Sequence, residues 1–403
     1  MKTIKVRIEP NAEQRHSIDI QIDANRIVYN GMITACKLKY EKDAKLPSVF
    51  DLNKIGTRMR KNSPYIASAY SMTLNETSKR VISSAKKTMD NEKKRSGELD
   101  LERFDFDIAP KYPRYRSKSQ FSSYTYPSTR DYSLTEVKIK GKTKRRLRLG
   151  KVPGEIRCYN NRTKLNGVPK TCTIVRKDMG TYSLYYACIS YEPYPEEIVK
   201  ADKGPIGIDV GVKNIAALSD GTIFPNDHAF ERHRRKLAKE QRRMSRHTPG
   251  TREHKLSMAR VNHIHEKIKN RRRNNTENIS AYIVKHHDPI AMEDLSVRGL
   301  RHISMDRRMT NGYNDASPGM LRRRIQDKAE SAGREIILID PKGTSQECSD
   351  CGAIIKKRLS DRTHSCKYCG LTIDRDVNAA KVILKRALSL QSPMGSAGDP
   401  VSG

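Results

Sequence analysis

The sequence lacks any long hydrophobic run, and acidic residues are scarce beside basic ones. No apolar stretch approaches the roughly 20 residues that a membrane-spanning helix needs, so we expect no membrane partner. The first residues alternate as in a β-strand and do not form a signal peptide. The 403 residues include 79 Lys and Arg against 46 Asp and Glu, a formal net charge of +33. That charge predicts a polyanionic partner such as nucleic acid, with a solvated basic surface as the simpler alternative.

A disulfide framework is also missing, although the sequence contains eight cysteines. Four of them are scattered among apolar positions and are expected to be small, reduced core residues of a cytoplasmic protein; they are Cys36, Cys158, Cys172 and Cys188. The other four form two pairs of the Cys-x-x-Cys type, Cys348 with Cys351 and Cys366 with Cys369. Two such pairs can present four thiolates to one ion, which predicts a closed, structural Zn²⁺ site.

The length predicts about two to four compact units, and the two halves of the chain differ in pattern. In the first half, residues 1–8 predict a strand, 11–40 and 66–89 predict helices, and 112–191 follow the period of β-strands. A helical block is therefore inserted into a β-rich domain. Residues 112–126 also interleave aromatic and basic side chains, which suits base stacking with phosphate contact, although a solvated face is an equal alternative.

The second half has an α/β pattern. Its expected elements are strands at 206–212, 215–218 and 222–224, basic helices at 229–245 and 252–284, a strand at 289–295, a helix at 319–331, a strand at 335–340 and a helix at 377–388. The tail after residue 390 is rich in Ser, Gly and Pro and is expected to be disordered.

Three acidic residues lie at the ends of elements that should pack in one sheet. Asp209 and Glu293 end apolar strands, and Asp376 begins the last helix, on the side of the stripe that should face the sheet. Burying a lone carboxylate is costly unless it is paired or binds a metal. Each acid alone is most simply a cap or a strand-end residue, and Asp374 is the better candidate for the N-cap. Together they could hold two Mg²⁺ ions for phosphodiester hydrolysis.

These motifs, taken in order, resemble the TnpB (OrfB) family, which insertion sequences of bacteria and archaea encode and which is traditionally labelled transposase. The resemblance covers residues 201–388 and rests on segments 207–212 (GIDVGV), 218–221 (LSDG), 292–295 (MEDL), 343–352 (GTSQECSDCG) and 374–380 (DRDVNAA). The family is ancestral to type V CRISPR effectors.

The resemblance implies a fold class of α/β plus β-barrel and helical insert. A RuvC-like nuclease of the RNase H fold carries an inserted zinc ribbon, and an N-terminal wedge β-barrel is split by a helical recognition domain. The implied domains are the barrel (1–10 and 111–200), the recognition domain (11–110), the nuclease (201–345 and 373–390), the zinc ribbon (346–372) and a disordered tail (391–403).

The implied activity is RNA-guided, Mg²⁺-dependent cleavage of DNA beside a short flanking motif, in the bacterial or archaeal cytoplasm and on the nucleoid when DNA is bound. Guide RNA and target DNA are the implied partners. The catalytic and Mg²⁺-binding acids would be Asp209, Glu293 and Asp376, and the loop at 304–314 would cover them. The thiolates of Cys348, Cys351, Cys366 and Cys369 would hold Zn²⁺.

Nucleic-acid contacts are expected at ten residues. Four follow from the looser N-terminal resemblance, and six belong to the two basic helices; they are Tyr29, Asn30, Arg114 and Arg116, then Arg234, Arg235, Lys236, Arg271, Arg272 and Arg273. Three rival functions remain open from the sequence alone. They are a compact type V CRISPR effector, a DNA strand-transferase using the same acids, and a nucleic-acid-binding regulator without cleavage.

Overall fold

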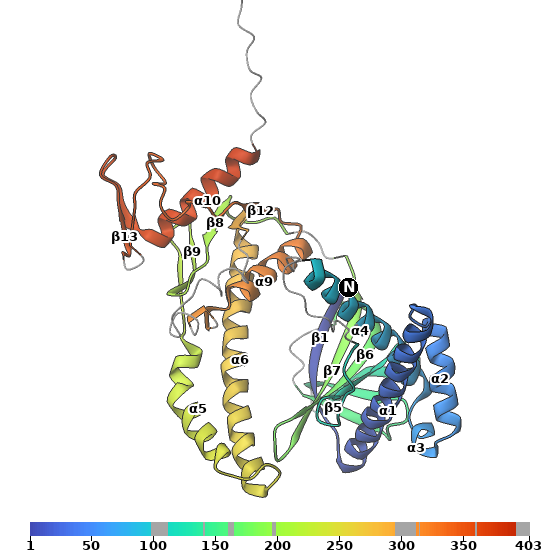
Figure 1. The fold of residues 1–403 in the computed structure, drawn as a ribbon. Coiled ribbons are helices and arrows are strands. Elements are labelled where there is room, and N and C mark those ends of the chain that lie inside the picture. Colours follow the sequence, from blue (N-terminus) through green and yellow to red (C-terminus); the bar gives the residue numbers. More distant parts are fainter. Residues whose placement is uncertain are drawn as a thin grey trace, which may run out of the picture. The chain divides into compact units, whose positions relative to one another are not determined.

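The computed structural model describes residues 1–97, 112–139, 142–159, 165–195, 199–294, 312–313, 315–358 and 361–391. The chain divides into two compact units, Met1–Pro195 and Glu196–Gly403, each of which is described by itself (Figure 1). Most of the expected covering loop at 304–314 and the tail after Gln391 lie outside the described residues. Among the described helices, none combines the length and the apolar character needed to cross a bilayer.

The first unit is a seven-stranded antiparallel sheet with helices inserted after its first strand. Strand β1 (Lys2–Glu9) lies inside this sheet between β5 and β7, and the strand order is β2-β6-β7-β1-β5-β4-β3. The other strands are β2 (Ser123–Tyr126), β3 (Tyr132–Ile139), β4 (Lys142–Leu149), β5 (Glu155–Tyr159), β6 (Gly167–Asp178) and β7 (Ser183–Pro193). The predicted helical insertion into a β-rich domain is confirmed. Among the described residues no ladder joins β2 to β3, so closure into a barrel stays a prediction.

The inserted helices begin at residues whose side chains cap them. Helix α1 (Ala12–Asp43) has a capping box, because the Asn11 side chain accepts from the Gln14 amide at 2.8 Å and Gln14 accepts from the Asn11 amide at 3.0 Å. The sequence analysis missed α2 (Val49–Lys61) and the short α3 (Pro64–Ala67). Helix α4 (Ser71–Gly97) therefore starts later than expected. The apolar stripe of α2 is short, with Leu52 and Gly56 buried, so periodicity alone did not reveal it.

The second unit is built on a five-stranded mixed sheet in the order β10-β9-β8-β11-β12. Strand β8 (Ile206–Asp209) is antiparallel to β9 (Asn214–Leu218) and parallel to β11 (Ile290–Glu293). Strand β12 (Ile336–Ile339) is parallel to β11, and β10 (Ile223–Pro225) is antiparallel to β9. The carboxyl ends of β8 and β11 consequently meet at one edge of the sheet.

Helices cover both faces of this sheet, because side chains alternate along each strand. Ile290 and Met292 of β11 pack with α6 (Arg252–His286) and α9 (Pro318–Ser331). Ala291 faces the other way and packs with Ile383 and Ala387 of α10 (Arg375–Gln391), which bears out the predicted apolar stripe of that helix. Helix α5 (Ala229–Ser245) pairs with α6 through a separate small core.

Candidate metal centres and nucleic-acid interface

Glycine 207 lets helix α10 lie directly against strand β8. A Cβ atom built on Gly207 would stand 2.1 Å from the Ala380 carbonyl oxygen and 2.8 Å from the Leu384 nitrogen. Both are backbone atoms of α10, so they cannot move aside as a flexible side chain would. The Gly-Ile-Asp motif thus has a packing reason for its glycine, which lets Ala380 and Leu384 of α10 lie against the strand that carries Asp209.

The three predicted carboxylates gather at this edge of the sheet. Asp209 is the last residue of β8, Glu293 is the last residue of β11, and Asp376 lies in the first turn of α10. Burial, together with the charges of Glu293 and Asp376, raises the pKa of Asp209 to about 8. The charges of Glu293 and Asp376 therefore act on Asp209.

Each of the other two carboxylates is held by a polar neighbour. The Thr344 hydroxyl donates to the Glu293 carboxylate, while burial raises the Glu293 pKa against the opposing effects of this bond and of Arg386. Asn214 donates from Nδ2 to Oδ2 of Asp376 at 3.0 Å. Sequence reasoning missed Thr344 and Asn214. The available signal for Asn214 was a polar residue opening an otherwise apolar strand.

Asp374 caps α10, as predicted. Its Oδ1 accepts from the amides of Asp376 at 2.8 Å and Val377 at 3.2 Å. Because Asp374 satisfies these amides, the Asp376 side chain is left to point elsewhere, toward Asn214. The roles of the two neighbouring acids are thereby separated.

The carboxylate set suits a hard divalent cation. It offers only oxygen ligands, and one of its members has a pKa raised to about 8 by burial and by the other two charges. A bound cation would relieve that repulsion, and Mg²⁺ prefers such oxygen ligands while retaining waters.

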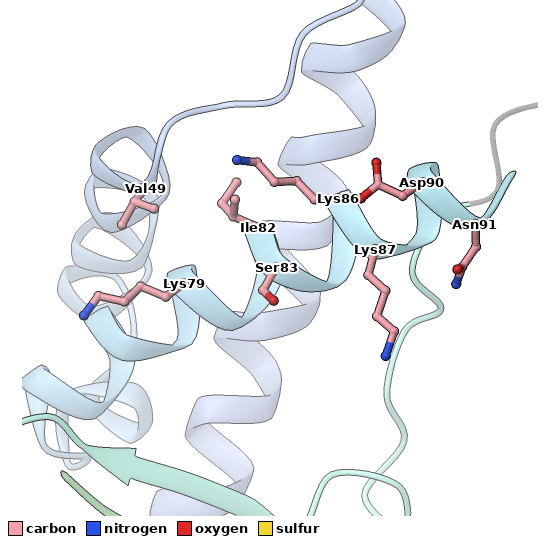
Figure 2. Close-up of a pocket in the computed structure, with 8 residues that line it drawn as sticks. All are labelled: Val49, Lys79, Ile82, Ser83, Lys86, Lys87, Asp90 and Asn91. Carbon is pink, nitrogen blue, oxygen red and sulfur yellow. The ribbon is translucent and has the colours of Figure 1, made fainter. Parts of the chain in front are cut away.

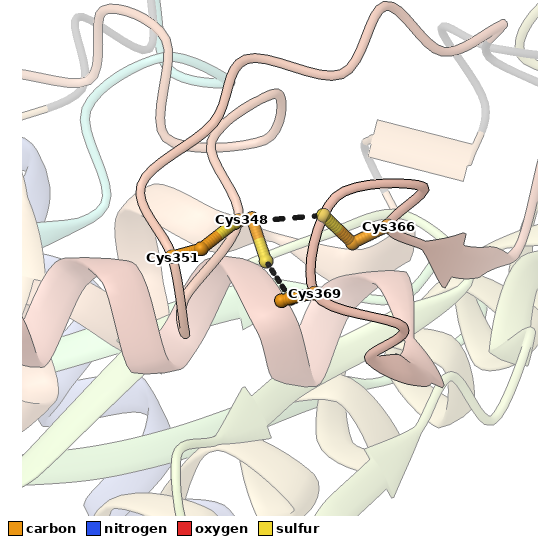
Figure 3. Close-up of side chains that lie close together, drawn as sticks. All are labelled: Cys348, Cys351, Cys366 and Cys369. Carbon is orange, nitrogen blue, oxygen red and sulfur yellow. Dashed lines mark hydrogen bonds between the residues drawn. The ribbon is translucent and has the colours of Figure 1, made fainter.

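The four clustered cysteines bring their sulfur atoms together (Figure 3). All four Sγ atoms lie within 4.8 Å of one another, with 3.6 Å between Cys348 and Cys369 and 3.6 Å between Cys351 and Cys366. A disulfide needs about 2.05 Å, whereas a tetrahedral Zn²⁺ with Zn–S bonds of about 2.3 Å separates its sulfurs by about 3.8 Å. The geometry fits a single Zn²⁺ ion.

Glycines shape the two loops that carry these sulfurs. Gly352 and Gly370 follow the second cysteine of each pair and have φ of 75° and 76°. Each donates its amide back to the first cysteine of its pair, at 3.0 Å to the Cys348 carbonyl and 2.9 Å to the Cys366 carbonyl. Backbone amides of Cys369 and Tyr368 also lower the pKa of Cys366 to about 6, which favours the thiolate.

Comparisons with known proteins show which proteins the chain resembles. Family models match at residues 188–304 (probable transposase), 319–383 (Cas12f1-like, TNB domain) and 1–45 (helix-turn-helix domain). The chain is 30% identical over 290 residues to a putative RNA-guided DNA endonuclease of Streptomyces pristinaespiralis, spanning 69% of this chain and 66% of that one. It is 28% identical over 286 residues to the putative RNA-guided DNA endonuclease InsQ of Escherichia coli K12, spanning 68% of each.

The chain belongs to the TnpB family. A solved complex of Cas12f1 with sgRNA and target DNA is similar in fold, with a TM-score of 0.51 and 16% identity over 92% of this chain and 82% of that one. A CasPhi-2 structure bound to crRNA and phosphorothioate DNA also gives a TM-score of 0.51, with 10% identity over 96% and 91%. The span matched as helix-turn-helix consists here of β1 and the single long helix α1.

The basic residues expected to bind nucleic acid in this TnpB family member fall into two groups on α5 and α6. Arg234, Arg235 and Lys236 are exposed on α5. On α6 each of these basic side chains has an acidic partner. Arg271 contacts Asp227. Arg272 lies 2.9 Å from Asp315, and Arg273 lies 4.0 Å from Glu277. Because Asp315 is only 6% exposed, Arg272 has a structural partner in the fold as well as a basic charge.

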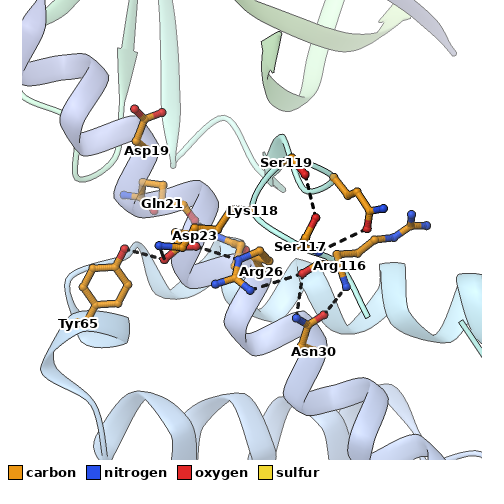
Figure 4. A network of polar contacts seen from close by, with 12 residues as sticks. Asp19, Gln21, Asp23, Arg26, Asn30, Tyr65, Arg116, Ser117, Lys118 and Ser119 are labelled. Atoms are coloured by element: carbon orange, nitrogen blue, oxygen red, sulfur yellow. Dashed lines mark hydrogen bonds and ion pairs between the residues drawn. The ribbon is translucent and has the colours of Figure 1, made fainter. Parts of the chain in front are cut away.

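The N-terminal expectations need one correction. Tyr29 is 4% exposed, and its ring packs against Phe121 with centroids 5.6 Å apart, so it is buried in the core and is not presented for stacking on a base. Asn30 clamps the backbone of Arg116, accepting from its amide at 2.9 Å and donating to its carbonyl at 3.0 Å (Figure 4). This clamp fixes the segment on α1 while Arg114 and Arg116 remain exposed.

A basic hollow that sequence reasoning missed lies between α2 and α4 (Figure 2). Its volume is about 580 Å³, and its lining includes three lysines, Lys79, Lys86 and Lys87. Lys79 and Lys86 are seven residues apart on α4, which places them on one face of the helix. That spacing was the signal in the sequence.

Proposed function

We propose that this chain is an RNA-guided, Mg²⁺-dependent DNA endonuclease of transposon origin, with a RuvC-like site formed by Asp209, Glu293 and Asp376. The observation that carries the proposal is that these acids lie at the ends of β8 and β11 and in the first turn of α10, where burial and the neighbouring charges raise the Asp209 pKa to about 8. The sheet supports it, because three antiparallel strands continue into two parallel ones, as an RNase H fold requires.

The family and the charge supply the guide and the target. Curated relatives in this family are named putative RNA-guided DNA endonucleases, and the net charge of +33 suits two nucleic-acid partners. In this scheme base pairing reads the target sequence while the protein reads shape and a short flanking motif. The exposed basic side chains of α5 would contact the phosphates of the guide–target heteroduplex.

The residues of the site have distinct tasks. Bound Mg²⁺ ions would activate water and stabilise the leaving oxygen of the phosphodiester, leaving 5′-phosphate and 3′-hydroxyl ends. Asp209, whose pKa is raised to about 8, would hold the cations in its deprotonated form together with Glu293 and Asp376. Thr344 holds Glu293 in place, and Asn214 orients Asp376. The closed thiolate set would bind Zn²⁺ for structure alone.

The decisive experiment assays cutting by the purified protein with its co-expressed RNA. The copurified RNA is sequenced, and plasmids carry the matching target beside a randomised flanking sequence. Asp209→Asn should lower Mg²⁺-dependent cutting by about a thousandfold, since loss of about 4 kcal/mol of metal-derived stabilisation corresponds to that factor. Asp327→Asn is the matched control, because Asp327 is an exposed acid on α9 of the same unit.

Three outcomes would count against the proposal. Undiminished cutting by Asp209→Asn would overturn the site. Joined rather than cut products would favour a strand-transferase. RNA and target binding without cleavage at any Mg²⁺ concentration would favour a regulator.

A further inference from the structure

A single buried amide connects the carboxylate edge to the cysteine cluster. Asn378 is fully buried and lies two residues after Asp376 on α10. Its Oδ1 accepts from the Ser349 amide at 3.0 Å, and its Nδ2 donates to the Glu347 carbonyl at 2.7 Å. These two backbone groups flank Cys348, so the amide binds the first cysteine loop on both sides of a thiolate ligand.

A second contact fixes the same loop to α10 two turns further along. Arg386 donates to Oε2 of Glu347 from Nε at 3.1 Å and from Nη2 at 2.6 Å. Its Nη1 also donates to the Lys342 carbonyl at 2.8 Å. The loop therefore contacts α10 at residues 378 and 386, which resists both sliding and rotation of the helix.

The loop also reaches a second carboxylate. Thr344, four residues before Cys348, is 1% exposed and donates its hydroxyl to Glu293. Residues 344–349 thus hold Glu293 directly and hold Asp376 through Asn378 and α10. Cys348 lies within this run, with its sulfur 3.6 Å from that of Cys369.

We propose that Asn378 is a positioning residue that couples the shape of the cysteine loop to the placement of Asp376, so that Zn²⁺ at the thiolates strengthens divalent-cation binding at the carboxylates. The inference rests on the proposed function for the identity of the carboxylate site. Zn²⁺ fixes the loop backbone, the loop fixes Asn378, and Asn378 fixes the first turn of α10. Neighbours of metal ligands commonly change metal affinity 10–100-fold when mutated.

The test compares two full-length proteins, each loaded with Zn²⁺ and each carrying one substitution in α10. Asn378→Ala removes both loop contacts. Ile383→Val is the control for stability, because Ile383 is fully buried on the same helix but packs on the sheet. Mn²⁺ serves as the probe for the carboxylates, with its dissociation constant measured by electron paramagnetic resonance. Zn²⁺ release is followed with a colorimetric chelator, and thermal unfolding is recorded for each protein.

Asn378→Ala should weaken Mn²⁺ binding about tenfold and speed Zn²⁺ release. Ile383→Val should lower the melting temperature while leaving both metal readouts within about twofold of wild type. Wild-type Mn²⁺ affinity in Asn378→Ala overturns the coupling alone, and equal weakening by Ile383→Val overturns it in favour of general destabilisation. Wild-type protein that binds no Mn²⁺ overturns the coupling together with the proposed function, which separates the two failures.

Discussion

The thiolate cluster and the carboxylate set are two groups of metal-ligating side chains that the fold assembles by different means. The four sulfurs come from two short loops within 22 residues of chain, and their donor atoms all lie within 4.8 Å. Among the described residues no other group of three or more such side chains is as compact. The carboxylates come from β8, β11 and α10, and the chain from Asp209 to Asp376 is 168 residues long.

The two groups also differ in how the fold holds their donor atoms. Backbone amides favour a thiolate at Cys366, and glycines with positive φ preform both loops. The carboxylates have no such preformed loops: Glu293 and Asp376 raise the Asp209 pKa, and α10 is held by contacts made elsewhere, at Gly207 and Asn378. The thiolates are therefore a structural centre, and the carboxylates form a strained centre of the kind found at functional sites.

The largest expected effect comes from removing one of the four thiolate ligands. Cys351→Ser removes one ligand, and the Zn²⁺ that this centre would bind contributes on the order of 10 kcal/mol to structural sites. We expect loss of bound metal and rapid hydrogen exchange across residues 344–374, measured by metal analysis and mass spectrometry. Cys188→Ser, in the other unit, should keep its metal. A Cys351→Ser protein with full Zn²⁺ content would contradict the tetrathiolate assignment.

The next effect tests what holds the carboxylates together. Gly207→Ala places a Cβ 2.1 Å from the Ala380 carbonyl oxygen, so strand and helix must separate. We expect a loss of about 3 kcal/mol or more in the free energy of unfolding, as for overpacked cores, measured by urea denaturation. Gly204→Ala is the control, because a Cβ there meets nothing within 4 Å. Equal stabilities for the two variants would show that α10 does not depend on this close approach.

A third experiment measures how the free energy of unfolding depends on pH through the ionisation of Asp209. The Asp209 pKa is about 8 in the folded protein and about 3.9 in an unfolded chain, so the folded state retains a proton between these values. In Mg²⁺-free buffer, stability from this group falls as pH rises from about 4 to about 8. Asp209→Asn should thus be close to wild type near pH 4 and more stable by a few kcal/mol at pH 8.

Urea denaturation at pH 5 and pH 8, with and without Mg²⁺, checks this prediction. Added Mg²⁺ should stabilise wild type at pH 8 and leave Asp209→Asn unchanged. If Asp209→Asn were less stable than wild type at pH 8 without Mg²⁺, the ionised Asp209 would not destabilise the folded protein.

The smallest expected effect concerns a basic side chain that is exposed to solvent. Arg235→Ala, on the exposed face of α5, should weaken RNA binding modestly and reduce the slope of log affinity against log salt by about 1. Arg272→Ala should instead cost about 2 kcal/mol of stability, because it leaves the buried Asp315 without its ion pair. Filter binding across a salt series separates the two. An unchanged slope for Arg235→Ala would remove α5 from the interface.

The sequence predicted the features that depend on neighbouring residues. The cysteine spacing, the Asp374 cap and the apolar stripe of α10 are all local, and the structure bears them out. Thr344, Asn214 and Asn378 were missed because their partners lie 51, 162 and 29–31 residues away.

Tyr29 was misassigned for a reason already visible in the sequence. It lies on the same apolar stripe of the first helix as Ile22 and Ile33, which are buried with it. The stripe favoured a core position, while the looser N-terminal resemblance favoured a contact with nucleic acid.

The contact made by Asn378 also bears on how this family can change. Its two partners are main-chain atoms of Glu347 and Ser349, so the bond does not depend on which side chains those positions carry. Lys367 and Tyr368, between the cysteines of the second pair, are exposed, so a substitution there leaves both bonds of Asn378 in place. The exposed surface of the second cysteine loop can consequently change while the bonds between Asn378 and the first loop persist.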